Sequence, residues 1–189
     1  MKKRPILFSA PMVRALLAGK KTQTRRVIKP VQPRNDGMWP AGRDPVPDCP
    51  HGKVGDYMWV RETLRSHGHF GFPLGEMPQL DAINRRIWSY AADEIPDHTG
   101  TRVSIHMPRW ASRIMLEITG VRVERLRDIG EDDACAEGCN THGMNLRPAP
   151  GGMLPCVQLY SELWESINGP GSWNANPWVW VLEFKRITP

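Results

Sequence analysis

Hydrophobic and polar positions alternate with a period of two in several short segments of the chain. The alternation at residues 57–61, 113–119 and 121–126 predicts β-strands with one buried face. Gly120 separates two of these segments and predicts a bulge or a tight bend rather than a full hairpin. Residues 178–184 are almost continuously apolar, which predicts a strand at the centre of a sheet. Further strands are predicted at residues 4–8, 22–28 and 87–91.

Three other segments have the pattern of helices. Residues 9–18 form the first, with Ser9 at its N-cap and Gly19 where a helix end favours a positive φ. Residues 131–138 begin with three acidic side chains and end in glycine, which is typical of a short helix. Residues 157–167 place their apolar side chains on one side, as an amphipathic helix does.

Proline and glycine are concentrated between these elements and predict long loops. We expect a single domain over residues 1–189, with loop insertions near residues 30–54, 64–86 and 139–155 and a further loop at residues 93–102. Few strand pairs leave room for a helical crossover, which disfavours a parallel doubly wound sheet. The predicted fold class is therefore α+β, mainly β, built as a small mixed or antiparallel β-barrel with peripheral helices.

Charge is distributed unevenly along the chain. Residues 1–34 carry ten Lys and Arg and no acidic side chain, within a total net charge of +5. Such a positive region is expected where a polyanion docks, and a solvated basic face is the simpler alternative. No apolar run approaches the roughly 20 residues of a membrane span, so neither a membrane partner nor an export signal is expected. We predict a cytoplasmic protein.

The four cysteines are expected to be thiols in that compartment. Cys135, Cys139, His142 and Cys156 can be drawn together as a zinc site, but their spacing fits no strong zinc signature. The sequence therefore predicts no metal and no cofactor.

The richest chemistry lies in the segment from Gly19 to Arg26, where a helix end leads into a strand. Its spacing Gly19-x-Lys21-x-x-Thr24-x-Arg26 resembles the signature of the ASCH domain, a member of the PUA-like β-barrel superfamily. The supporting segments follow in the same order: the Gly55-Asp56 turn, the strand Leu116-Glu117-Ile118-Thr119, the helix end Ala134-x-x-Glu137-Gly138 and a closing strand with Glu183-Phe184. The whole chain resembles ASCH-domain proteins encoded by tailed phages and prophages.

This resemblance implies a cleft that binds RNA, a nucleoside or a nucleotide. The run from Lys21 to Arg26 is also similar to the core motif of bacterial acetylcytidine amidohydrolases. The similarity implies that Lys21, Thr24 and Glu137 are catalytic and hydrolyse the exocyclic amide of an N-acylated cytidine without a metal. This chain has longer loops than those small enzymes, and such loops can reshape the cleft. The shared motif therefore does not identify the substrate of this chain.

The three implied catalytic residues can meet only if the backbone places Lys21 outside the regular strand. In a regular strand Lys21 and Thr24 point to opposite faces, so Lys21 must lie in the turn after Gly19, before the alternation begins. Burial and the neighbouring Arg25 and Arg26 would then lower the pKa of Lys21 and allow it to act as a base. Arg25 and Arg26 are both candidates for binding a substrate or nucleic acid, and Arg26 is a candidate donor to an oxyanion or a phosphate.

Five other residues are weaker candidates for substrate or nucleic-acid binding. Arg61 and Glu62 end a predicted strand, and an ordinary ion pair is the alternative. His106, Arg109 and Trp110 combine a titratable group, a phosphate partner and a stacking surface, which suits single-stranded RNA, and core packing is the alternative for Trp110. Two other functions stay open, a non-catalytic RNA-binding regulatory module and a ribonuclease. No obligatory protein partner is inferred.

Overall fold

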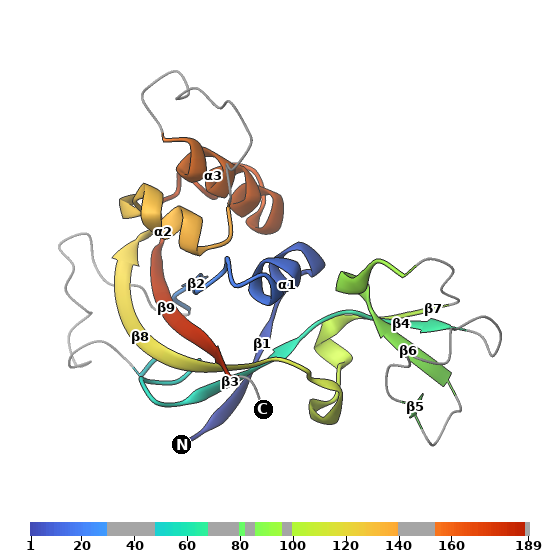
Figure 1. Cartoon of the computed structure of the whole chain (residues 1–189). Helices are drawn as coiled ribbons and strands as arrows, with labels where there is room; N and C mark the ends of the chain where they lie inside the picture. Colours follow the sequence, from blue (N-terminus) through green and yellow to red (C-terminus); the bar gives the residue numbers. More distant parts are fainter. Residues whose placement is uncertain (30–47, 68–79, 82–85, 96–99, 140–153, 188–189) are drawn as a thin grey trace.

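The computed structural model describes residues 1–29, 48–67, 80–81, 86–95, 100–139 and 154–187 (Figure 1). Within these ranges a five-stranded sheet carries the three α-helices, and a smaller four-stranded sheet lies beside it. The helices are α1 (Ala10–Leu17), α2 (Glu131–Ala136) and α3 (Pro155–Asn168). The larger sheet contains β1 (Lys3–Leu7), β3 (Tyr57–Arg61), β8 (Met115–Arg125), β9 (Trp178–Ile187) and β2 (Gln23–Val27), in that order.

The larger sheet is mixed. Strands β1 and β3 are parallel, whereas the pairs β3–β8, β8–β9 and β9–β2 are antiparallel. The apolar strand β9 lies between β8 and β2, so its predicted central place is confirmed. The predicted fold class, α+β and mainly β, is confirmed as well.

The long strand β8 curves around the helices (Figure 1). Its register against β9 shifts between Ile118 and Gly120, which confirms the predicted bulge. A bulge bends its strand and increases the local twist. The two edge strands of the curved sheet, β1 and β2, are not paired to each other within the described residues. Arg26 connects these edges instead, because its Nη2 donates to the main-chain oxygen of Leu7 at 2.6 Å.

The smaller sheet contains strands in two segments where the sequence predicted loops. Its strands are β5 (Leu80–Asp81), β6 (Arg86–Tyr90), β4 (Leu64–His67) and β7 (Gly100–Arg102), in that order. The prediction of a loop over residues 64–86 was wrong for β4 and β5, and the loop over residues 93–102 was wrong for β7. These strands are two to four residues long, and cross-strand pairing stabilises them rather than a local hydrophobic pattern. The other two predicted insertions lie mostly outside the described residues.

Four single-turn 3₁₀ helices connect these elements within the described part of the chain. They are η1 (Ala91–Asp93), η2 (Ser104–His106), η3 (Arg109–Ala111) and η4 (Leu126–Asp128). Helices η2 and η3 lie between β7 and β8, where the chain passes from the smaller sheet to the larger one.

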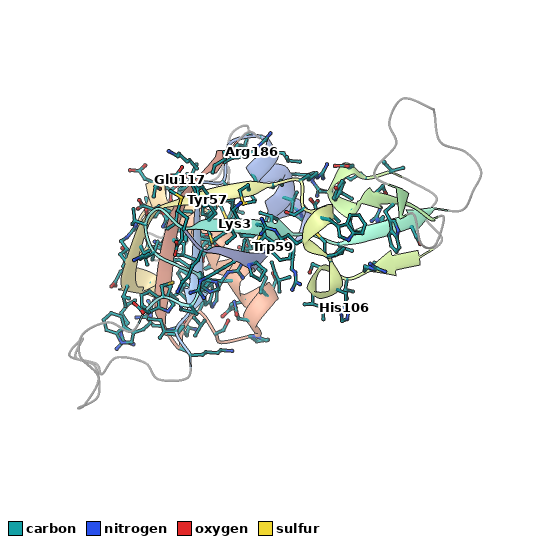
Figure 2. All side chains as sticks on the ribbon, turned by 90° about the horizontal axis from the view of Figure 1, so that it is seen from below. Lys3, Tyr57, Trp59, His106, Glu117 and Arg186 are labelled. Carbon is teal, nitrogen blue, oxygen red and sulfur yellow. The ribbon has the colours of Figure 1, made fainter. Side chains whose placement is uncertain are left out.

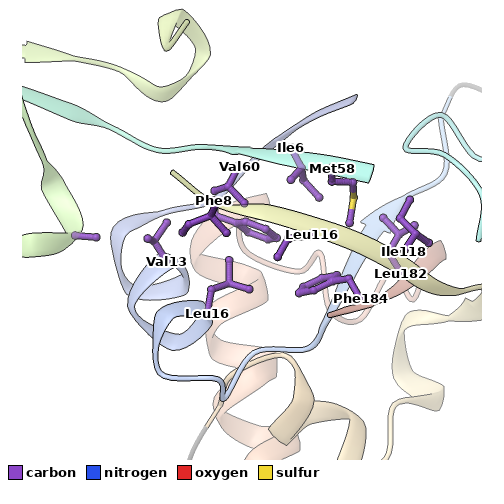
Figure 3. Packing of buried hydrophobic residues seen from close by; sticks show 12 residues of the cluster. Ile6, Phe8, Val13, Leu16, Met58, Val60, Leu116, Ile118, Leu182 and Phe184 are labelled. Atoms are coloured by element: carbon purple, nitrogen blue, oxygen red, sulfur yellow. The ribbon is translucent and has the colours of Figure 1, made fainter. Parts of the chain in front are cut away.

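Two apolar clusters hold the helices on the larger sheet. Val13 and Leu16 of α1 pack with Phe8, Leu116 and Phe184 (Figure 3). A second cluster joins α2 and α3 to the other end of β9, and it includes Ala134, Tyr160, Trp164, Trp173 and Val179. Each fully buried apolar side chain contributes about 1.5–3 kcal/mol, so these clusters fix the positions of the helix ends that carry the polar site. No helix in the described ranges is long and apolar enough to cross a membrane.

Candidate functional site

Lys21 lies in the connection between α1 and β2, before the strand begins. Gly19, with a φ of 70°, turns the chain out of the helix, and the amides of Lys20 and Lys21 both donate to the main-chain oxygen of Ala15. Because Lys21 precedes the strand, its side chain does not have to follow the alternating directions of the strand side chains, as the candidate site requires. Thr22 is exposed, whereas Thr24 is buried.

The Lys21 ammonium group is completely buried and fully hydrogen-bonded. Its Nζ donates at 2.8 Å to three oxygens, namely the main-chain oxygen of Gln23 and both the main-chain oxygen and Oε2 of Glu137. Burial lowers the pKa of Lys21, and the attraction of Glu137 opposes that shift. Nearby Arg26 lowers the pKa further. The net effect of these opposing influences is a lowered pKa, so Lys21 loses its proton more easily than a surface lysine does. Lys21 nevertheless stays in contact with the Glu137 carboxylate.

Glu137 reaches this lysine because helix α2 ends beside the turn after α1. It is the C-cap residue of α2, and Gly138 follows with a φ of 96°. A Cβ atom on Gly138 would lie 3.1 Å from the Cβ of Ala15 and 3.4 Å from that of Lys21. Glycine is thus needed here both for its backbone conformation and for the close approach of the two helix ends.

A small cavity opens beside this pair. It has a volume of about 70 Å³, and its walls include Met12, Thr24, Arg26, Glu137, Tyr160 and Trp164. Glu137 thus contributes to the cavity wall and also holds Lys21. Burial and the Glu137 charge raise the pKa of the Tyr160 phenol, so it is a neutral donor at physiological pH. The cavity is smaller than the several hundred Å³ typical of pockets for whole drug-sized ligands.

Arg26 covers one side of the cavity. Its Cζ and the Nζ of Lys21 each lie 5.4 Å from the ring centroid of Phe8, so both cations contact one aromatic ring. Within the described part of the chain its buried Nε has no hydrogen-bond partner. An unpaired buried donor is costly, and an anionic ligand would satisfy it.

Arg25 also lines the cavity, and carboxylates hold its guanidinium group. Its Nη2 donates to Asp133 Oδ2 at 2.7 Å and to Glu124 Oε2 at 3.2 Å, and its Nη1 reaches Glu137 Oε1 at 3.3 Å. Arg122 binds the same two acids, Glu124 and Asp133. The pairing with Arg25 and Arg122 outweighs burial and lowers the pKa of Asp133. Arg25 thus positions Glu137 at the cavity wall.

Arg61 and Glu62 do not line the cavity. The Glu62 carboxylate is buried, and both its oxygens accept from Arg113, each at 3.0 Å. Burial raises the pKa of Glu62, and Arg113 opposes that shift. Arg113 also donates to Asp93 at 2.7 Å, so this network connects the larger sheet to η1. Arg61 stacks on Trp59, with its Cζ 4.8 Å from the ring centroid.

His106, Arg109 and Trp110 form a separate exposed surface on η2 and η3. The Trp110 side chain is 54% exposed, which removes the alternative of core packing. In Figure 2 His106 lies on the side of Trp59 toward the smaller sheet, away from Tyr57 and Glu117. The structure therefore brings the β2 candidates and Glu137 to the cavity and places the η2 and η3 candidates on a separate surface.

Sequence reasoning missed the acids that hold Arg25 and the place of Tyr160 in the cavity wall. Asp133 was visible only as one of three acids in a helix first turn, and Tyr160 only as an apolar-face residue. Trp173, which has the pattern of a loop residue, is buried against Tyr160 at a centroid distance of 6.2 Å. Among the described residues, one group with the atoms of a metal site occurs at Glu131, Cys135 and Cys156, and none of them lines the cavity.

Two solved structures are similar to this chain over almost all its length. One is an ASCH domain from Lactobacillus crispatus, with 12% identity, a TM-score of 0.43, and an alignment covering 98% of this chain and 79% of that one. The other is a protein from Enterococcus faecalis of the DUF984 family, with 11% identity, a TM-score of 0.40, and coverage of 99% and 80%. No family model and no curated protein matches the sequence. At such low identity the roles of the site residues must come from their own contacts.

Proposed function

We propose that this chain is a nucleoside- or nucleic-acid-binding domain that hydrolyses the exocyclic amide of N-acylated cytidine. The observation that carries the proposal is the meeting of Lys21 with Glu137 beside a cavity that Thr24 also lines. A base, a proton carrier and a hydroxyl are the groups that amide hydrolysis needs. The resemblance of the Lys21–Arg26 motif to the acetylcytidine amidohydrolases supports the same reaction.

In this proposal Lys21 acts as the base in its neutral form, which its burial favours. It takes the proton from the Thr24 hydroxyl, or from a water that Thr24 positions, and the resulting oxygen attacks the acyl carbon. Glu137, which contacts the lysine at 2.8 Å, carries the proton to the departing cytidine amine. If Thr24 attacks, water then releases the acyl group from its oxygen as a carboxylic acid. The products in both versions are cytidine and a carboxylate.

The negative charge that forms on the carbonyl oxygen needs donors in the same cavity. Arg26 offers its unpaired Nε, and Tyr160 offers a neutral phenol. The 70 Å³ volume suits a small acyl group with its amide rather than a whole nucleoside. We therefore expect the acyl group to enter the cavity and acetyl to be preferred over bulky acyl groups.

A hydrolysis assay on a panel of N-acylated cytidines tests the proposal. Thr24→Val removes the hydroxyl at nearly constant volume, and Thr22→Val is the matched control because Thr22 is exposed three residues after Gly19. We expect turnover in the wild type and in Thr22→Val, and its loss in Thr24→Val. A covalent acyl group on Thr24, detected by mass spectrometry after rapid quenching, identifies Thr24 as the nucleophile. Absence of turnover with every substrate would contradict the catalytic proposal.

A second candidate function is non-catalytic binding of single-stranded RNA. It is favoured by the surface formed by His106, Arg109 and the 54% exposed Trp110, because bases stack on exposed aromatic rings. Trp110→Ala should lower RNA affinity by about 1–3 kcal/mol without changing amide hydrolysis. The measurement is fluorescence anisotropy of a labelled RNA over a range of salt concentrations, with the integrity of the RNA checked on a gel. Cleaved RNA would favour a ribonuclease instead.

A further inference from the structure

Two cysteines meet where α2 packs against α3. Cys135 lies in α2 and Cys156 in the first turn of α3, and their Sγ atoms are 2.6 Å apart. Cys135 is exposed to solvent, whereas Cys156 is buried. A reagent in solution can therefore reach one thiol of the pair while the other lies directly behind it.

The two helices are already held in position at this point. The Glu131 carboxylate, one turn before Cys135, accepts from the main-chain amide of Cys156 at 2.9 Å and from that of Val157 at 3.3 Å. These bonds cap the first turn of α3 with a side chain of α2. The sulfurs need to approach by about half an ångström to reach the roughly 2.05 Å of a disulfide bond.

The same group contains the atoms of a possible metal site, but its geometry favours a disulfide. Two thiolates on one tetrahedral zinc ion lie about 3.8 Å apart when the Zn–S bonds are about 2.3 Å, and this separation is much larger than the 2.6 Å between the two sulfurs here. The Glu131 oxygens already accept amide protons of α3. Within the described residues no fourth ligand joins the group.

We propose that Cys135 and Cys156 are a reversible thiol–disulfide pair, a modification site that joins α2 covalently to α3. The oxidant is a small organic disulfide. One cysteine thiolate attacks it, forms a mixed disulfide and releases one thiol. The second cysteine then attacks its partner's sulfur and releases the second thiol. The two cysteines lose two protons and two electrons in total, and the reagent is reduced to two thiols.

The bond would connect two walls of the cavity, because α2 ends at Glu137 and α3 carries Tyr160. It would also close a loop of 21 residues, which restricts the unfolded chain and raises the melting temperature. The pair reacts slowly at neutral pH, since burial, Cys156 and the acidic side chains Glu131 and Asp132 raise the pKa of the Cys135 thiol to about 12. A neutral reagent avoids repulsion by these carboxylates.

The test treats the full-length protein with hydroxyethyl disulfide at pH 8, followed by peptide mapping without reductant. We expect one cross-linked peptide pair joining Cys135 to Cys156, and a rise in melting temperature that a reductant reverses. Cys139→Ser is the matched control and keeps the cross-link, whereas Cys135→Ser, at an exposed position, abolishes it.

Three results would overturn the proposal. One is a mixed disulfide on Cys135 that never proceeds to the cross-link. Another is a cross-link that uses Cys139 in place of Cys135. The third is one equivalent of zinc in the purified protein that protects both thiols from the reagent until a chelator removes it. None of these readouts depends on the proposed hydrolase activity.

Discussion

Lys21 Nζ lies 2.8 Å from Oε2 of Glu137 and 2.8 Å from the main-chain oxygen of the same residue, although 116 positions separate the two in the chain. Both side chains are buried, with exposed fractions of 0% and 3%. The contact fixes the end of α2 against the turn after α1. It is at once a structural link and the centre of the proposed catalytic site.

Glu137→Gln should destabilise the fold by about 3 kcal/mol, because it leaves the buried Lys21 ammonium without a counter-charge. Glu117→Gln is the control, since the exposed Lys185 pairs with Glu117 at 3.2 Å and such surface pairs contribute less than about 1 kcal/mol. Urea denaturation of both variants measures the difference. Equal midpoints for the two variants would show that the buried pair adds little to stability.

Gly138→Ala should cost more stability than Gly55→Ala. Both glycines have a positive φ, 96° and 85°, so each alanine incurs a backbone cost of about 1–2 kcal/mol. Only at Gly138 does the new Cβ meet neighbours, the nearest being the Cβ of Ala15 at 3.1 Å, while at Gly55 nothing lies within 4 Å. Thermal unfolding of the two variants separates the steric part from the shared backbone part. A smaller loss at Gly138 than at Gly55 would contradict the close approach.

The His51 side chain should make the protein acid-sensitive. Burial, aided by Arg26 and Arg4, lowers the pKa of His51 from 6.5 to about 4. A pKa that is lower in the folded state means that the unfolded state binds more protons between these values. Stability is therefore complete above pH 6.5 and is lost as the pH falls through that range toward 4.

Between pH 7.5 and pH 5 this linkage should amount to about 2 kcal/mol. The measurement is the free energy of unfolding at both pH values for wild type, His51→Asn and, as the control, His106→Asn at an exposed position. We expect the pH-dependent loss to shrink in His51→Asn alone. An unchanged loss in that variant would assign the acid sensitivity to other groups.

Tyr160→Phe should lower kcat for amide hydrolysis by about 10²-fold with little change in KM, as expected when one donor to a developing oxyanion is removed. The ring keeps its contacts with Trp164 and Trp173, so stability should change little. Tyr90→Phe is the matched control, because the Tyr90 hydroxyl donates to Ala111 at 2.9 Å and does not line the cavity. It should lose about 1 kcal/mol of stability and keep its kcat. A kcat unchanged in Tyr160→Phe would exclude Tyr160 as the donor.

Features governed by local physics were predictable from the sequence. Gly19 marks the turn after α1 because a positive φ is easiest for glycine, and this turn allows Lys21 to escape the strand alternation. Gly120 marks the bulge in β8 because a Cβ at this position would lie only 2.6 Å from Oε2 of Glu183. The continuous apolar run of β9 indicated a central strand because both of its faces are covered. Each of these signals lies within a few residues of the feature that it predicts.

The tertiary structure alone decided which partner each polar side chain meets. Arg25 and Arg26 are adjacent cations in the sequence, yet α2 presents Asp133 to one, and the edge of β1 presents a main-chain oxygen to the other. The short strand β4 and the thiol pair of Cys135 with Cys156 likewise depend on segments distant in the chain. Hydrophobic periodicity and turn residues encode local conformation, whereas long-range pairing depends on which surfaces the packed core brings together.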